Sequence, residues 1–131
     1  MPWAQAFVAL VALAAAALYL FMGARVGAAR AKYNVVAPAT AGNPIFERTF
    51  RVQQNTLEQL PVFLVGLYFF SAHLSALGAA IIGVIWLLGR VLYMQSYIAD
   101  PAKRGPGALI TFASEAVLVI GGAVGVIRSI M

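Results

Sequence analysis

Two short polar stripes stand out in a chain that is otherwise strongly apolar. Each consists of three side chains spaced so that an α-helix places them on one face. The stripes are Arg51, Asn55 and Glu58, and Arg90, Tyr93 and Tyr97. Together they offer cations for carboxylates, a carboxylate for an ammonium group, an amide and two phenols, a set that suits a small zwitterionic peptide. The alternative is that these residues cap helices and meet lipid headgroups, because arginine and tyrosine are enriched at membrane interfaces.

The composition indicates that the stripes are held by a membrane protein. Of the 131 residues, 63% are hydrophobic and only 10% are charged, whereas an average soluble domain is about 45–50% apolar and about 25% charged. The absence of cysteine excludes disulfides, thiolate metal sites and a thiol nucleophile supplied by the protein. One histidine and four acids make a metal centre improbable, so we expect no metal. The net charge of +5 is interpreted as orienting helices and not as binding nucleic acid.

The charge pattern predicts a single all-α domain over residues 1–131, with four transmembrane helices at about 3–30, 44–72, 78–98 and 106–129. The uncharged stretch 59–89 is too long for one span of about 20 residues, so we expect a turn within 71–78. The apolar part of the second helix, residues 60–72, is shorter than the ~30 Å hydrocarbon core. This helix must therefore begin earlier, with Asn43 as its N-cap and Pro44 in its first turn. The two stripes then lie on successive helices of a hairpin.

The distribution of basic residues predicts the topology. Seven of the nine lie in the first and third loops or beside them, and none lies in the second. The positive-inside rule places loops one and three in the cytoplasm and both termini outside. The expected location is the inner membrane for a bacterial protein and the endoplasmic reticulum for a eukaryotic one.

Arg90 and Glu115 are the charged residues that fall well inside the predicted spans 78–98 and 106–129, where an isolated charge is costly. Arg90 and Glu115 should lie at a similar depth below the helix ends at loop three. We therefore predict that they pair, with Glu58 as the rival partner of Arg90.

Three motifs resemble those of the MAPEG superfamily, the membrane-associated proteins in eicosanoid and glutathione metabolism. The first runs from Phe46 to Glu58 and continues to Pro61, the second from Gly89 to Tyr97, and the third from Pro101 to Gly105. The resemblance covers essentially the whole chain. It implies four helices, a homotrimer, and glutathione as co-substrate bound between subunits near the cytoplasmic face.

The resemblance also implies roles for individual residues. Residues expected to contact glutathione from one subunit are Arg51, Asn55, Glu58, Tyr93, Tyr97 and Arg104, and those from its neighbour are Arg30 and Gln53. Arg104 matches the family residue that favours the glutathione thiolate, so it is the predicted catalytic residue. Two positions depart from the pattern. Gln59 stands where some relatives carry tyrosine, and Ala31 stands where the leukotriene-synthesising branch has a second arginine.

These features predict a membrane-bound glutathione transferase that attacks lipophilic electrophiles arriving from the lipid, with glutathione-dependent peroxidase as a related activity. One alternative is a non-catalytic lipid-binding adaptor of the same superfamily. Another is a small multidrug transporter, which typically needs an acid in its first span, whereas here residues 1–24 carry no charge.

Overall fold

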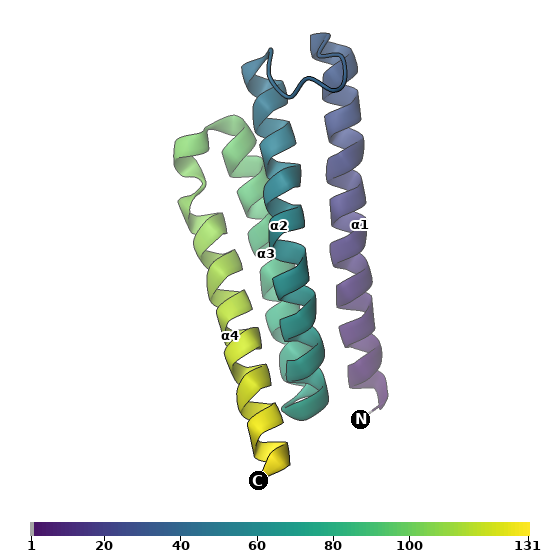
Figure 1. Cartoon of the computed structure of the whole chain (residues 1–131), viewed down its shortest axis with the longest axis vertical. Helices are drawn as coiled ribbons and strands as arrows, with labels where there is room; N and C mark the ends of the chain where they lie inside the picture. The colour runs from purple at the N-terminus through teal and green to yellow at the C-terminus, as the bar shows by residue number, and fades with distance from the viewer. Residues whose placement is uncertain (1) are drawn as a thin grey trace.

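A computed structural model describes residues 2–131 as four long helices and one short 3-10 turn (Figure 1). The helices are α1 (Pro2–Tyr33), α2 (Pro44–His73), α3 (Ala76–Ala99) and α4 (Gly105–Ile130), and the 3-10 turn η1 (Pro101–Lys103) precedes α4. The described residues contain no strand. The all-α prediction is confirmed, and each helix extends slightly beyond its predicted range.

The helices run up and down in one bundle (Figure 1). The α1–α2 connection and η1 lie at one end, called the loop end below, while the α2–α3 turn and both termini lie at the other, called the turn end. Both α2 and α3 pack against all three other helices. Side chains of α2, α3 and α4 can therefore converge on one site.

Local sequence determines where the two central helices begin. The Asn43 Oδ1 atom accepts hydrogen bonds from the backbone N–H groups of Ile45 at 2.9 Å and Phe46 at 3.1 Å. This is the side-chain cap predicted for α2, and Pro44 follows it without losing a needed donor. At the start of α3, the Ser75 Oγ atom accepts from the Gly78 N–H at 2.9 Å. The α2–α3 turn lies within 71–78, as predicted.

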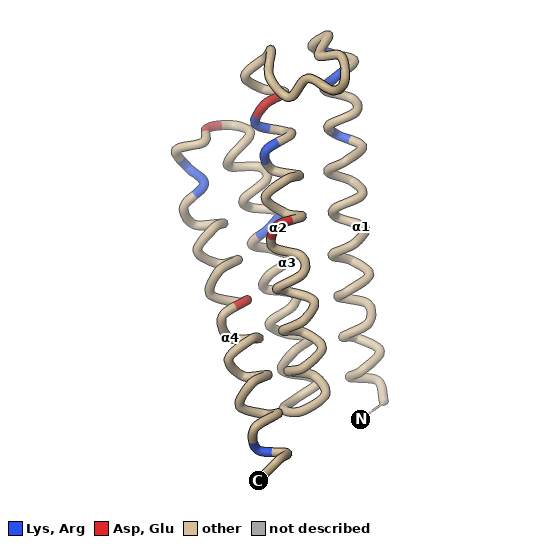
Figure 2. The backbone as a smooth tube through the Cα atoms, in the orientation of Figure 1, with Lys and Arg blue, Asp and Glu red and all other residues tan. Residues whose placement is uncertain are grey.

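Helices α1 and α3, and the segment 101–130 that includes α4, are long and apolar enough to span a membrane. Helix α2 has 30 residues and is about 45 Å long at ~1.5 Å per residue, but its loop-end half is polar. Figure 2 shows most charged residues near the loop end. Arg90 and Glu115 are buried within the bundle. The polar half of α2 thus brings side chains for chemistry into an otherwise apolar bundle.

Small residues and aromatic rings hold the helices together. The Phe63 and Trp86 rings stack with centroids 3.9 Å apart and planes 11° from parallel. A Cβ atom on Gly107 would lie 2.5 Å from the Tyr93 backbone nitrogen, and one on Gly125 would lie 2.8 Å from the His73 carbonyl oxygen. Glycine therefore lets α4 approach α3 at the loop end and α2 at the turn end, as small residues do between membrane helices.

Candidate functional site

A pocket of about 450 Å³ opens between α2, α3 and α4 in the loop-end half of the bundle. Both polar stripes contribute to it. Its lining residues are Arg51, Asn55, Gln59, Arg90, Tyr93, Tyr97, Arg104, Ala108, Thr111 and Phe112. The pocket therefore combines three guanidinium groups, two phenols and two amides with an apolar wall from α4.

The α2 side of the pocket is a row of polar side chains on successive turns. Arg51, Asn55 and Gln59 are each separated by four residues, so the row extends about 12 Å along the helix axis. Gln59 marks the end of the row that lies deeper in the bundle. The position continues the spacing of the predicted stripe, which is the signal that would have identified Gln59 as a pocket residue.

Arg90 is the buried polar anchor of the pocket, with 1% of its surface exposed. Its Nη2 atom donates to Asn55 Oδ1 at 2.9 Å and to Thr56 Oγ1 at 2.7 Å, and its Nη1 atom donates to Thr111 Oγ1 at 3.5 Å. These bonds join α2, α3 and α4 through one side chain. Because the acceptors are neutral, Arg90 keeps its positive charge available to the pocket that it lines.

The predicted pairing of Arg90 with Glu115 or Glu58 is wrong. Among residues 2–131, the one ion pair joins Arg51 Nη1 to Glu58 Oε1 at 3.1 Å. The reason is the helix register. Thr111 is the α4 residue that reaches Arg90, and Glu115 lies one turn further toward the turn end.

Neutral hydrogen-bond donors surround Glu115, which is buried within the bundle at 5% exposure. Its Oε1 atom accepts from Trp86 Nε1 at 2.8 Å. Oriented so that both of its amide ends are satisfied, Gln59 turns Nε2 toward the same carboxyl group, 2.7 Å from Oε2 and 3.1 Å from Oε1. The sequence does not identify Trp86 as a partner of Glu115, because a tryptophan in an apolar helix does not reveal its polar contact.

Two tyrosines form the α3 wall. The Tyr93 and Tyr97 rings stack with centroids 5.5 Å apart, and the Arg90 guanidinium lies 4.4 Å from the centroid of the Tyr93 ring. Tyr93 is 5% exposed, while Tyr97 is half-buried. Because the Arg90 stack and the burial restrain Tyr93, this wall is held in place before any ligand enters.

Arg104 lies between η1 and α4 and is one of the residues that line the pocket. Its Nη1 atom donates to the Pro101 carbonyl oxygen at 3.1 Å, and the side chain is exposed. The positive end of the α4 helix dipole lies at the same place, since α4 begins at Gly105. A guanidinium and a helix N-terminus together favour an anionic group here.

Three predicted site residues do not line the pocket of the single chain. Glu58 is engaged by Arg51, and both side chains are about half exposed, at 53% and 50%. Arg30 donates to the carbonyl oxygens of Val35 at 3.3 Å and Ala39 at 2.6 Å. Gln53 faces α1, where its Nε2 atom would lie 3.1 Å from a Cβ placed on Gly23. Arg30 and Gln53 are the pair expected to act on a neighbouring subunit, so the single chain does not test that role.

Comparison with known proteins identifies the family. The MAPEG family model matches residues 8–124. The chain belongs to the MAPEG family.

Relatives of this MAPEG protein include enzymes named for glutathione chemistry. Human microsomal glutathione S-transferase 2 is 34% identical over 94% of this chain and 84% of its own length. Mouse leukotriene C4 synthase is 34% identical over 76% of this chain and 66% of its own length. An uncharacterized protein of Synechocystis, sll1147, is 49% identical over 86% of this chain and 82% of its own length. The resemblance drawn from the three motifs is thereby confirmed.

The family is membrane-associated, in agreement with the three helices that are apolar enough to span a bilayer. Together with the names of the relatives, the family supports a glutathione-utilising function for the chain. The pocket lining has three arginines and no acidic side chain, which suits a ligand that carries carboxylates.

Proposed function

We propose that the protein is a membrane-bound glutathione transferase that activates the glutathione thiol for attack on lipophilic electrophiles. The observation that carries the proposal is the convergence of Arg51, Asn55, Tyr93, Tyr97 and Arg104 on one pocket in a MAPEG chain. Arg51 would bind a carboxylate, and Asn55 would bind an amide group of the tripeptide. Glu58, freed from Arg51, would bind the ammonium group. The apolar wall of Ala108 and Phe112 would face the second substrate.

Activation of the thiol requires a cation, because the protein has no thiol of its own and a free thiol with a pKa near about 8.5 is mostly protonated at neutral pH. Arg104 and the N-terminus of α4 would stabilise the thiolate relative to the thiol, which lowers the thiol pKa. The thiol proton leaves to water, and the thiolate sulfur forms a bond to the electrophilic carbon. The carbon–leaving group bond breaks at the same centre, and its electron pair departs with the leaving group.

The test is conjugation by the purified protein in liposomes that contain a lipophilic aryl halide. Loss of glutathione thiol and formation of the thioether should require the protein and saturate with both substrates. The thiolate absorbance of the bound glutathione should appear at a lower pH than that of free glutathione. Saturable glutathione binding without any thioether would favour the adaptor alternative. Thiol loss with a lipid hydroperoxide in place of the halide would measure the related peroxidase activity.

We further propose a homotrimer in which Arg30 and Gln53 complete the pocket of a neighbouring subunit. Support comes from their position, because both lie away from the pocket of their own chain. Arg30→Ala and Arg51→Ala subunits should each bind glutathione weakly alone. Mixed trimers should regain some competent sites, where intact Arg30 and Arg51 come from different subunits. Verified mixed trimers without recovery would indicate a pocket built within one chain.

The proposed orientation places the loop end in the cytoplasm and both termini outside, in the inner membrane of a bacterium or the endoplasmic reticulum of a eukaryote. It rests on the basic residues of the first and third loops, which lie at the same end of the bundle (Figure 2). Single cysteines at Ala102 and Ser75 should react with an impermeant reagent from opposite sides of sealed vesicles. Reaction from one side only would contradict four spans.

A further inference from the structure

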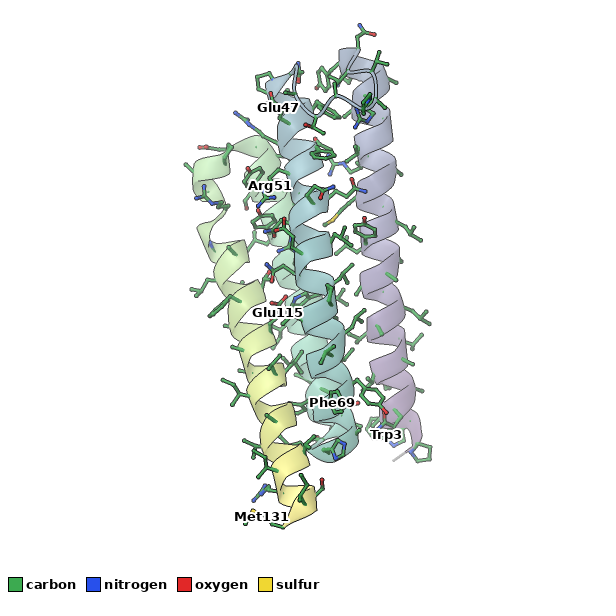
Figure 3. The ribbon with its side chains drawn as sticks, viewed as in Figure 1. Trp3, Glu47, Arg51, Phe69, Glu115 and Met131 are labelled. Carbon is green, nitrogen blue, oxygen red and sulfur yellow. The ribbon has the colours of Figure 1, made fainter. Side chains whose placement is uncertain are left out.

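A second polar cluster lies beneath the pocket and away from both ends of the bundle. It consists of Glu115, Trp86 and Gln59, from α4, α3 and α2. Figure 3 shows Glu115 in the middle part of the bundle, further from the loop end than Arg51. Glu115 is 5% exposed and Trp86 is fully buried, so neither is available to a ligand from outside.

An acidic side chain at this depth has a cost that its packing must offset. Glu115 makes no ion pair among residues 2–131; its contacts are the hydrogen bonds from Trp86 Nε1 and Gln59 Nε2. Hydrogen bonds between membrane helices are individually weak. Two or three such bonds are a weak reason to retain a buried acid for folding alone, which points to a role in the adjacent site.

Gln59 is the member of the cluster that also lines the pocket. A glutamine amide has a donor end and an acceptor end of nearly the same shape, so its environment must select one orientation. The Glu115 carboxyl oxygens accept from the Gln59 Nε2 end, with Oε2 at 2.7 Å, and so hold that end of the amide. Oε1 is turned to the other side, where the amide meets donors.

The carboxyl group is itself held in place. Trp86 donates to its Oε1 atom at 2.8 Å, and the Trp86 ring is fixed by its stack on Phe63. A continuous set of contacts therefore runs from the apolar core to the deep end of the pocket. Without the carboxyl group, the Gln59 amide would lose the contact that selects its orientation.

We propose that Glu115 is a positioning residue for the pocket: it holds the Gln59 amide in one orientation, so that the tripeptide meets a preorganised polar surface at the deep end. This inference rests on the proposed glutathione site. It assigns to Gln59 a support from α4. Glu115 does not touch the ligand and acts only through Gln59.

The test is a double-mutant cycle on glutathione affinity, measured by equilibrium binding to the purified full-length protein. Glu115→Gln keeps the side-chain volume but offers an amide where two donors need acceptors. It should weaken binding about fivefold in the otherwise unchanged protein, the worth of one hydrogen bond of about 1 kcal/mol. In a Gln59→Met background, the same substitution should change affinity less than about twofold, because the residue through which Glu115 acts is gone.

Two further variants separate positioning from general damage. Trp86→Phe removes the donor to Glu115 but keeps a ring against Phe63, so it should weaken binding in the original background and not in the Gln59→Met background. It also tests the proposal if Glu115→Gln fails to fold. Ser114→Ala is the matched control, because Ser114 is buried on the same helix and bonds only to backbone carbonyls of its own turn. It should leave affinity unchanged.

Equal losses in both backgrounds, or no loss in either, would overturn the positioning role while leaving the glutathione site intact. Failure of the unchanged protein to bind glutathione at all would instead remove the proposed function, and the positioning role with it.

Discussion

The two halves of the bundle are held together in different ways. In the turn-end half, apolar contacts dominate: Gly121 and Gly78 pack against the Phe70 ring, and Gly125 packs against the backbone at His73. In the loop-end half, Arg90 joins three helices through hydrogen bonds to Asn55, Thr56 and Thr111. The difference indicates a division of labour, with packing that sets helix positions in one half and directed polar bonds that shape a pocket in the other.

This comparison explains why the pocket can carry several charges in an apolar protein. Lipid offers no hydrogen bonds, so polar groups in a membrane protein must find partners within it. Of Arg90, only the Nε atom is buried without a partner, while its Nη atoms are bonded. Hydrogen-bonding groups of the protein thereby stabilise the Arg90 charge in the loop-end half. The turn-end half, where apolar contacts dominate, does not need such partners.

The largest expected effect on catalysis comes from the pocket mouth. Arg104→Ala should lower kcat near neutral pH about 30-fold, the consequence of a thiol pKa raised by about 1.5 units. Activity should recover as alkaline pH ionises the bound thiol unaided, and glutathione KM should change less. Pre-steady-state thiolate absorbance against pH measures the pKa directly. Lys103→Ala is the matched control, since that neighbouring cation does not line the pocket, and an Arg104→Ala protein with an unchanged thiol pKa would leave Arg104 as a loop charge.

A cavity in the turn-end half should lower stability and leave glutathione binding unchanged. Phe70→Ala removes a buried ring that packs against Gly121, and should lower the free energy of unfolding by about 3 kcal/mol through the cavity left behind. Glutathione affinity of the folded fraction should be unchanged. Thermal unfolding in detergent and equilibrium binding, run on the same preparation, make the comparison. A parallel loss of affinity would show that the two halves are not independent.

The same glycine-to-alanine substitution can be made near each end of α4, at Gly107 and at Gly125. A Cβ atom on Gly107 would meet the Tyr93 backbone at 2.5 Å, and one on Gly125 would meet the His73 backbone at 2.8 Å. Gly107→Ala and Gly125→Ala should each destabilise the bundle by about 1–2 kcal/mol, because overpacking moves α4. Only Gly107→Ala should also weaken glutathione binding, since it displaces the Tyr93 wall. Equal affinity in the two variants would contradict the division.

The smallest of these effects is a pure binding change. Arg51→Ala should raise the glutathione KM about tenfold, the loss of one charge-assisted contact to a carboxylate. The change in kcat should be smaller, because Arg51 binds ground state and transition state alike. Arg25→Ala is the control, an arginine of α1 that does not line the pocket. A fall in kcat at constant KM would indicate that Arg51 acts in the chemical step and not in glutathione binding.

Much of the fold follows from the order of the residues. The long uncharged stretches and the basic first and third loops predict four antiparallel helices, and Asn43 with Pro44 predicts where α2 begins. The side-chain periods predict that Arg51 and Asn55 share one face, and likewise Tyr93 and Tyr97. Both statements depend on contacts within a helix or on the thickness of the bilayer, and these are properties of local sequence.

The partners of the buried charged residues could not be predicted from the sequence in the same way. The sequence placed Arg90 and Glu115 at a similar depth and indicated a pair, but the structure has Thr111 level with Arg90 and Glu115 one turn away. A shift of one helical turn of α4 against α3 would exchange these two residues, and the close approaches at Gly107 and Gly89 fix that register. The helices and their polar faces were therefore determined by the sequence alone. Tertiary packing decided which faces meet and at which position along the helix axes. Contacts between helices depend on axial offsets of about 5 Å, one helical turn, and the residue spacing within a single helix does not specify these offsets.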